Sequence, residues 1–337
     1  FNPLAGRGAR NLSLAADFER TNRRMHNKSF TADNQVAVVG GRNIGDEYFE
    51  ARADVAFADL DVMVNGPVVG QVSTGFDRYW NSAAVFPIAA LGDMRPDAAD
   101  LAATRAALAD FTRSQQATPY AEALKASGLA RSLREGTLAA SYGRVRVVYD
   151  DPAKAAGTAE REALLLPQMA PEFEALRSEL LLVSPYFVPG EGGVAKLRAL
   201  RERGIRVRVV TNSLAATDVP MVHSGYAQYR RPLLEAGIEL HEVKPTATLA
   251  DAKREEKRER SEGAAHRVSG SSRASLHAKT QVFDRRALFV GSLNLDPRSV
   301  FTNTETGVVI DNPPLVDDML QAFDRQLPGL AYRVMLL

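Results

Sequence analysis

The chain has 337 residues, enough for a full hydrophobic core and for two domains, and its 45% hydrophobic and 25% charged content is ordinary for a soluble globular protein. Its formal net charge of +1 argues against nucleic acid as the main ligand, and the absence of cysteine excludes disulfide bonds and cysteine-based zinc sites. No apolar run reaches the ~18 residues that a membrane-spanning helix needs, and no signal peptide is visible.

The first part of the chain is predicted to form strands followed by a helix. Residues 26–31 alternate in polarity and end at the turn signal Asp33-Asn34. The elements predicted after this turn are strands over 35–39 and 59–64 and a helix over 68–80.

Residues 87–140 are rich in alanine and are predicted to be helical, with Asp97 as the N-cap of a helix over 98–112. We interpret this stretch as a connector packed on the sheet, because its apolar positions fit a stripe that faces a core. A helical insert that binds a membrane is the alternative.

The remaining residues alternate between strands and helices, which predicts an α/β architecture. The predicted strands are 144–149, 180–184, 205–210, 238–243 and 307–310, and the predicted helices are 171–179, 192–203, 223–236 and 315–325. Residues 246–274 carry mixed charges, which favours a solvated loop over a patch that binds lipid headgroups or nucleic acid.

A pattern of histidine, lysine, aspartate and asparagine occurs twice in the chain. The second copy reads H-x-K-x4-D-x6-G-S-x-N, and the first reads H-x-K-x4-D-x6-G-G-x-N. His277, Lys279, Asp284 and Asn294 each lie 251 positions after their counterparts His26, Lys28, Asp33 and Asn43. A constant offset over so many matched positions indicates an internal duplication.

The duplication divides the chain into residues 1–140 and 141–337. It extends beyond the motifs, because the strand beginning at Asp61 aligns with residues from Glu305 onward, and each is followed by an amphipathic helix. The second half has about 130 residues before its histidine, whereas the first has only 25 before His26. We therefore expect the beginning of the first half to be missing, and with it any signal or membrane anchor.

These doubled motifs resemble the signature of the phospholipase D superfamily, and the resemblance covers the whole chain. Within that superfamily the sequence is most similar to the bacterial cardiolipin synthases of the C type. The phrases that carry this similarity are residues 22–29, 39–45, 183–189, 212–220, 222–226 and 291–299. The resemblance implies two similar α/β halves, each a mixed β-sheet flanked by helices, with one active site at their interface.

The resemblance also implies a chemistry for the doubled motif. One imidazole attacks phosphorus and forms a phosphohistidine, while the other protonates the leaving alcohol and then deprotonates the incoming one. By analogy with the family, His26 is the nucleophile and His277 the acid and base. Lys28 and Lys279 would neutralise the phosphate oxygens. Asn43 and Asn294 would donate hydrogen bonds to them.

Further site residues are expected around these six. Asp61 and Glu305 lie where the family places acids that orient the imidazoles, Ser292 is a further donor, and Gly41 permits close approach of the backbone. Asp33 and Asp284 end their strands, and for both we favour turn capping or a salt bridge over a catalytic role.

Three aromatic or histidine residues of the second half have two open interpretations. His223 and Tyr226, near Arg230 at a predicted helix start, are either pocket residues or structural ones. Tyr186 follows a strand end, where ligands of α/β sheets commonly bind, and its alternative is core packing. His241 and His266 are predicted to be structural or solvated.

The function predicted from this resemblance is transfer of a phosphatidyl group to phosphatidylglycerol. Hydrolysis by a phospholipase D is the first alternative, a nuclease is disfavoured by the charge, and a binding protein with an inactive site is disfavoured by the two intact motifs. The expected substrates are phosphatidylglycerol and, as a further donor, phosphatidylethanolamine. We expect no metal, no cofactor and no nucleic acid partner. The expected location is the bacterial inner membrane, with peripheral attachment or an anchor in the missing N-terminus.

Overall fold

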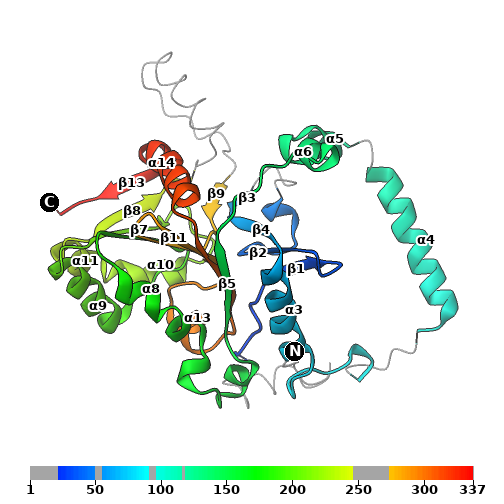
Figure 1. Ribbon diagram of the computed structural model, residues 1–337, viewed down its shortest axis with the longest axis horizontal. Coiled ribbons are helices and arrows are strands. Elements are labelled where there is room, and N and C mark those ends of the chain that lie inside the picture. Colours follow the sequence, from blue (N-terminus) through cyan, green and yellow to red (C-terminus); the bar gives the residue numbers. More distant parts are fainter. Residues whose placement is uncertain (1–21, 50–54, 91–95, 116–117, 246–272, 337) are drawn as a thin grey trace.

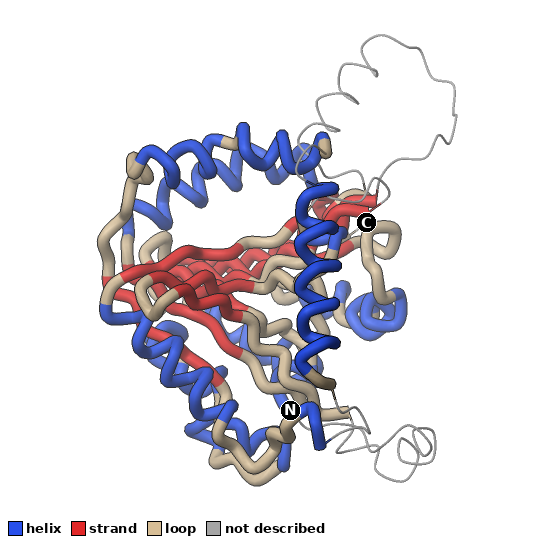
Figure 2. The backbone as a smooth tube through the Cα atoms, turned by 90° about the vertical axis from the view of Figure 1, so that its right-hand side faces the viewer, coloured by secondary structure: helices blue, strands red, loops and turns tan. Residues whose placement is uncertain are grey.

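The computed structural model describes residues 22–49, 55–90, 96–115, 118–245 and 273–336. The predictions for the first 21 residues and for the charged stretch 246–272 therefore lie outside the described residues. Viewed from the side, the strands run through the middle of the molecule and the helices lie outside them (Figure 2).

Most of the second half is organised around an eight-stranded mixed sheet. Strands β6, β7 and β8 run parallel to one another, and the neighbouring pairs are antiparallel. In spatial order the sheet consists of β13 (Ala331–Val334), β8 (Glu239–Val243), β7 (Arg206–Asn212), β6 (Glu179–Val183), β10 (Thr280–Phe283), β11 (Ala287–Gly291), β12 (Thr306–Asp311) and β5 (Arg144–Tyr149).

Both faces of this sheet are buried, which explains why its central strands are continuous apolar runs. Along β6, Leu180 and Leu182 belong to one core cluster, whereas Leu181 and Val183 belong to the other. The first cluster packs under α7 (Leu165–Gln168), α8 (Ala170–Ala175), α9 (Gly190–Glu202), α10 (Pro220–Ala227) and α11 (Arg230–Glu235). The short helices η3 (Pro152–Ala156) and η4 (Arg161–Ala163) precede α7 in the chain. The second cluster is shared with α14 (Pro313–Leu330) and with the first half of the chain.

The first half forms a smaller, three-stranded antiparallel sheet. Its strands are β1 (Ser29–Ala32), β2 (Val36–Gly40) and β4 (Asp61–Asn65), in the order β1-β2-β4. Buried side chains from β2, β4 and α3 (Pro67–Trp80) join those of β11 and β12 in one core. The two halves therefore pack against each other through apolar surfaces.

The backbone repeats the sequence duplication. Ser29 pairs with Val39 in the first half as Thr280 pairs with Val290 in the second, at the same offset of 251. The turns between these strands also match, because Asp33, Asn34, Asp284 and Arg285 all have positive φ angles near 50°. The prediction of an α/β fold with a mixed sheet flanked by helices is confirmed for the large sheet, whereas the described sheet of the first half is antiparallel.

One prediction about the fold is wrong. The connector was expected to pack on the sheet, but α4 (Ala98–Gln115) has no buried residue and stands apart from the sheets (Figure 1). It is followed by α5 (Pro119–Ala126) and by α6 (Gly128–Glu135), whose residues are also not buried. The local prediction for Asp97 is confirmed, since its side chain accepts hydrogen bonds from the N–H groups of Ala99 and Asp100. The apolar positions had suggested packing that the tertiary structure does not provide.

Several short elements were not predicted. They include η1 (Asp46–Tyr48), η2 (Ile88–Ala90), β13, α13 (Pro297–Phe301), and β3 (Val55–Ala58) with its parallel partner β9 (Arg273–Leu276). The β3–β9 pair joins the two halves directly beside the second motif.

Candidate active site

Each histidine of the doubled motif is bound to the opposite half of the chain. The backbone N–H of His277 donates to the carbonyl oxygen of Ala58, at 2.8 Å, immediately after the β3–β9 pair. In the same way, the N–H of His26 donates to the carbonyl oxygen of Thr304, at 2.9 Å, beside the isolated bridge between Met25 and Thr304. The duplication therefore produces an approximately symmetrical exchange of backbone hydrogen bonds between the two halves.

The residue that follows each of these carbonyl groups is a buried acid, and it contacts the imidazole. His277 Nδ1 lies 2.6 Å from Asp59 Oδ2, and His26 Nδ1 lies 2.8 Å from Glu305 Oε2. Both carboxylate side chains are 0% exposed. Since an ionised carboxylate only accepts hydrogen bonds, each neutral imidazole carries its proton on Nδ1 and has its lone pair on Nε2.

The acid next to His277 is Asp59, and the expectation that it is Asp61 needs correction. Asp61 Oδ2 instead accepts a hydrogen bond of 2.6 Å from Arg42 Nε. The strand register shows why, because Gly40 pairs with Asp61 whereas its counterpart Gly291 pairs with Gly307. Asp61 is therefore the counterpart of Gly307, and Asp59 that of Glu305. The alignment failed because the connection between asparagine and acid is longer in the first copy.

Lys279 is buried and Lys28 is partly buried, and both lie beside the imidazoles. Lys279 is 0% exposed, and its Nζ lies 2.9 Å from His277 Nδ1 and contacts the His277 carbonyl oxygen. Lys28 Nζ donates to the carbonyl oxygen of His26 at 2.9 Å. Burial lowers the pKa of Lys279 to about 7 and that of Lys28 to about 8, and it outweighs the nearby Asp59 and Glu305 carboxylates, which raise both values.

His277 is also enclosed by aromatic rings. Tyr48 packs edge-on against it at a centroid distance of 5.0 Å, and Phe57 lies at 5.4 Å and stacks on Tyr48. Burial lowers the pKa of His277, while the bond to Asp59 raises it and Lys279 lowers it further. Sequence reasoning missed the part played by Tyr48 and Phe57, because only the fold brings them to the second motif.

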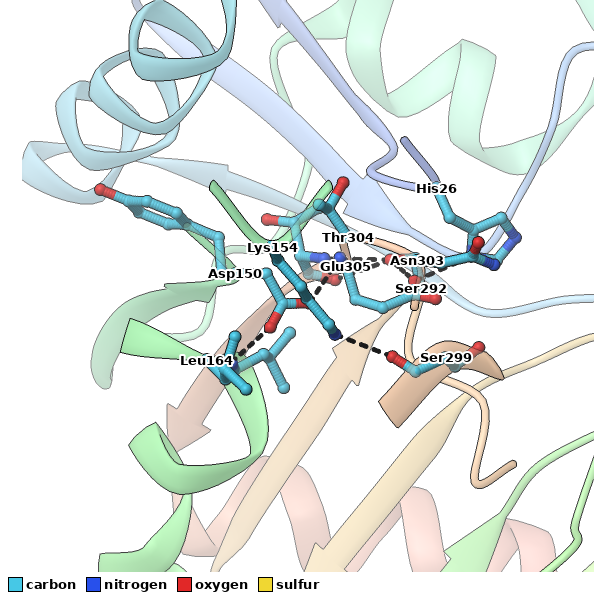
Figure 3. Close-up of polar contacts among 12 residues, drawn as sticks. His26, Asp150, Lys154, Leu164, Ser292, Ser299, Asn303, Thr304 and Glu305 are labelled. Atoms are coloured by element: carbon cyan, nitrogen blue, oxygen red, sulfur yellow. Dashed lines mark hydrogen bonds and ion pairs between the residues drawn. The ribbon is translucent and has the colours of Figure 1, made fainter. Parts of the chain in front are cut away.

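The carboxylate of Glu305 accepts a hydrogen bond from a side-chain hydroxyl, whereas the second donor to Asp59 is the backbone N–H of Leu60, at 3.0 Å from Oδ1. Ser292 Oγ donates to Glu305 Oε2 at 2.5 Å (Figure 3). The counterpart of Ser292 is Gly41, and a Cβ atom there would lie only 2.7 Å from Asp59 Oδ1. Gly41 is thus required for close packing of the Asp59 carboxylate, and the two histidines have different surroundings.

Comparison with known proteins agrees with this geometry. The family described as "Cardiolipin synthase, PLD-like domain" matches residues 172–327. The chain is 43% identical over 317 residues to cardiolipin synthase C from Escherichia coli (strain K12), and the match covers 94% of this chain and 64% of that protein. The chain belongs to the phospholipase D superfamily.

One further relative and one solved structure extend the comparison. An uncharacterized protein of Helicobacter pylori (strain ATCC 700392 / 26695) is 30% identical over 93% of this chain and 59% of its own length. The crystal structure of phosphatidylserine synthase from Haemophilus influenzae has the same fold, with a TM-score of 0.56 at 15% identity, over 92% of this chain and 63% of that one. The chain therefore spans less than two thirds of the length of these relatives.

The superfamily's two asparagines differ in their contacts. Asn43 Nδ2 donates to the Tyr48 hydroxyl at 2.8 Å. Asn294 is buried, and its Oδ1 has no hydrogen-bond partner within the described ranges. The first asparagine is thus bonded to Tyr48, which packs on His277, whereas the second has an oxygen that is unpaired among the described residues.

The aspartates of the two motifs lie at turns, away from the imidazoles. Asp284 accepts hydrogen bonds from the N–H groups of Arg177, Ser178 and Glu179 and from the Ser178 hydroxyl, and these bonds lower its pKa against the effect of burial. Asp33 is exposed and occupies the matching turn. This geometry agrees with a structural role for both.

The other pocket candidates separate into two groups. Tyr186 donates its hydroxyl to Asp218 Oδ2 at 2.7 Å, and the Asp218 charge acts on both Tyr48 and Lys279. Tyr186 therefore lies close to the motif residues.

His223 and Tyr226 are buried in a separate network. Glu242 accepts hydrogen bonds from Tyr226 and, through both oxygens, from Arg230, while His223 Nε2 lies 3.0 Å from Arg230 Nη2. Because their polar atoms are bound within the protein, this geometry favours the structural interpretation of His223 and Tyr226. Among the described residues no group of three or more histidine, cysteine, aspartate or glutamate side chains is placed to hold a metal ion.

Proposed function

We propose that this chain carries the active site of a phosphatidyltransferase that passes a phosphatidyl group to phosphatidylglycerol through a phosphohistidine. The observation that carries the proposal is the pair of imidazoles, each held at Nδ1 by a buried carboxylate from the opposite half, beside two lysines whose pKa values are lowered by desolvation. The 43% identity to cardiolipin synthase C supports the choice of substrates.

In the first step, Nε2 of His26 attacks the phosphorus of the donor phospholipid. The bond between phosphorus and the headgroup oxygen breaks, and protonated His277 gives its proton to that oxygen. His26 is the better placed nucleophile, because its side chain is 24% exposed whereas that of His277 is 6% exposed.

In the second step, His277 takes the proton from a glycerol hydroxyl of phosphatidylglycerol. The resulting oxygen attacks phosphorus, the bond between phosphorus and His26 breaks, and cardiolipin leaves. The cationic Lys28 and Lys279 stabilise the negative charge that accumulates on the phosphate oxygens in both steps. Asn294 and Asn43 border the same space.

We place the boundary between the halves near residue 140, and we propose a peripheral or anchored location at the bacterial inner membrane. Both follow from the duplication and from the lipid substrates. Within the described ranges, no helix is long and apolar enough to cross a bilayer.

The test uses the purified full-length protein with mixed phosphatidylglycerol and phosphatidylethanolamine, and follows the lipids by mass spectrometry. We expect cardiolipin, together with the alcohol released from the donor. Phosphatidic acid without cardiolipin would identify a hydrolase instead. Turnover that survives both His26→Ala and His277→Ala would refute the mechanism itself.

A further inference from the structure

A buried ion pair lies directly behind Glu305. Asp150 follows β5, and Lys154 lies one helical turn later in η3. Their side chains are 1% and 4% exposed, and Lys154 Nζ donates to Asp150 Oδ2 at 2.8 Å (Figure 3). Neither residue belongs to the doubled motif or touches an imidazole in the contacts described above.

Asp150 binds both backbone groups of Glu305. Its Oδ2 accepts the Glu305 N–H at 2.8 Å, and its own N–H donates to the Glu305 carbonyl oxygen at 3.0 Å. The other carboxylate oxygen accepts the N–H of Leu165 at 2.7 Å, and Lys154 Nζ also donates to the carbonyl oxygen of Ser299 at 3.0 Å. The pair thus connects the Glu305 backbone to two neighbouring segments.

Stability alone does not account for such a pair. A buried ion pair pays a large desolvation penalty, and well-packed apolar residues of similar volume often stabilise a fold as well or better. Burial raises the pKa of Asp150, and Lys154 opposes that shift. An apolar residue at position 150 would leave the Glu305 N–H without this acceptor, so the pair has a specific effect on Glu305.

The Glu305 side chain is the element that this arrangement fixes. Its Oε2 lies between His26 Nδ1, at 2.8 Å, and Ser292 Oγ, at 2.5 Å. A carboxylate held in this position keeps the His26 proton on Nδ1, and a displaced one would allow the proton to move to Nε2. The lone pair needed for attack on phosphorus would then be lost.

We propose that Asp150 and Lys154 are positioning residues for His26, which act by holding the backbone of Glu305 so that its carboxylate fixes the imidazole tautomer. The consequence for turnover rests on the proposed function, in which Nε2 of His26 attacks phosphorus. The effect on the tautomer does not, and it can be measured separately.

The experiment uses full-length protein labelled with ¹⁵N in histidine, and NMR spectra recorded at a pH where the imidazoles are neutral. The His26 signals are assigned by their loss in His26→Gln. In the wild type we expect the Nδ1–H form of His26, and in Asp150→Asn and Lys154→Met a mixture with the Nε2–H form. Turnover should fall at least ~10-fold in both variants, mainly in kcat rather than KM.

Arg208→Met is the matched control. Arg208 is a buried cation on β7 of the eight-stranded sheet, 3% exposed, and its ion pairs are with Asp324, at 2.5 Å, and Glu179, at 3.9 Å, rather than with residues of the site. We expect this variant to lose thermal stability while the His26 tautomer and the turnover of the folded protein stay as in the wild type. Lys154→Gln, which keeps a hydrogen-bond donor, serves if Lys154→Met does not fold, and its tautomer shift should be smaller than that of Asp150→Asn.

An unchanged His26 tautomer in folded Asp150→Asn and Lys154→Gln would overturn the proposal, as would an equal shift in Arg208→Met. A tautomer shift in a protein whose wild type transfers no phosphatidyl group would support the positioning role and refute the proposed function. The two proposals can therefore fail independently.

Discussion

Replacement of Asp59 tests the central feature of the site, the carboxylate that binds His277. Asp59→Asn keeps the size of the side chain and an oxygen that can accept the Nδ1 proton, but it removes the negative charge. The perturbation is therefore electrostatic, and it acts on a bond of 2.6 Å between groups that are 0% and 6% exposed.

The expected loss follows from the strength of that bond. A hydrogen bond to a charged group contributes about 1.5–3 kcal/mol, and every 1.36 kcal/mol of barrier changes a rate tenfold. Asp59→Asn should therefore lower kcat by about 10- to 150-fold. The Asp59 contact raises the pKa of His277, so the variant lowers that pKa further, and the acid form is lost at a lower pH than in the wild type.

The assay is cardiolipin formation by the full-length protein across a range of pH. Asp61→Asn is the matched control, since Asp61 lies two residues after Asp59 and forms its ion pair with Arg42 rather than with an imidazole. We expect this control to keep turnover within about threefold of the wild type, because it alters one partly exposed ion pair. Equal losses in both variants, or a loss only in Asp61→Asn, would refute the assignment of Asp59.

The remaining predictions concern the lysines, Ser292 and Asp284. Because the pKa values of Lys279 and Lys28 are about 7 and about 8, kcat/KM should decline as the pH rises through this interval. The decline in kcat should come at higher pH, since bound phosphate favours the charged lysines. A decline of kcat and kcat/KM over the same pH range would contradict this. The folded-state pKa of Lys279 lies below the ordinary lysine value of 10.5, so unfolding takes up a proton between about pH 7 and 10. In chemical denaturation the wild type should therefore gain up to ~1.4 kcal/mol of unfolding free energy per pH unit relative to Lys279→Met. Ser292→Ala should reduce turnover by about 5- to 10-fold through the lost bond to Glu305, while Ser292→Thr should retain more, as initial rates will show. Asp284→Asn should lower the free energy of unfolding by about 1 kcal/mol near neutral pH without changing the turnover of folded protein. The pKa of Asp284 is depressed, so this difference in unfolding free energy should disappear as the pH falls through that pKa. A difference that persists in acid would contradict the capping role.

The doubled motif made much of the site predictable from sequence. Its constant offset indicated a duplication, and the strand pairs β1–β2 and β10–β11 match in register and in the position of their turns, because strand pairing and turn chemistry are local properties of the repeat. The family resemblance supplied the fold of the two halves, which the structural comparison agrees with.

The acid next to His277 was not predictable from the same spacing. The offset changes between asparagine and acid, and two acidic residues lie two positions apart, Asp59 just before β4 and Asp61 at its first position. Only the register of β2 with β4 shows which of them reaches the imidazole. Asp61 pairs with Gly40 as Gly307 pairs with Gly291, so the residue two positions before Asp61, which is Asp59, is the equivalent of Glu305.

The residues that support the imidazoles from a distance were also missed, for a related reason. Asp150 and Tyr48 belong to neither motif. The contact of Asp150 with Glu305 depends on the pairing of β5 with β12 within the second half, and the contact of Tyr48 with His277 depends on how the two halves pack. The prediction for the helical connector was wrong in the opposite sense, since its apolar residues suggested packing on the sheet that α4 does not make.

The exchange of contacts between the halves has a consequence for when the enzyme becomes active. Each imidazole obtains its carboxylate from the other half, His277 from Asp59 and His26 from Glu305. During synthesis, therefore, neither histidine has a fixed tautomer until the last strands have been made and the halves have docked. The reactive site is assembled at the end of folding, and any loosening of the interface inactivates both histidines at once.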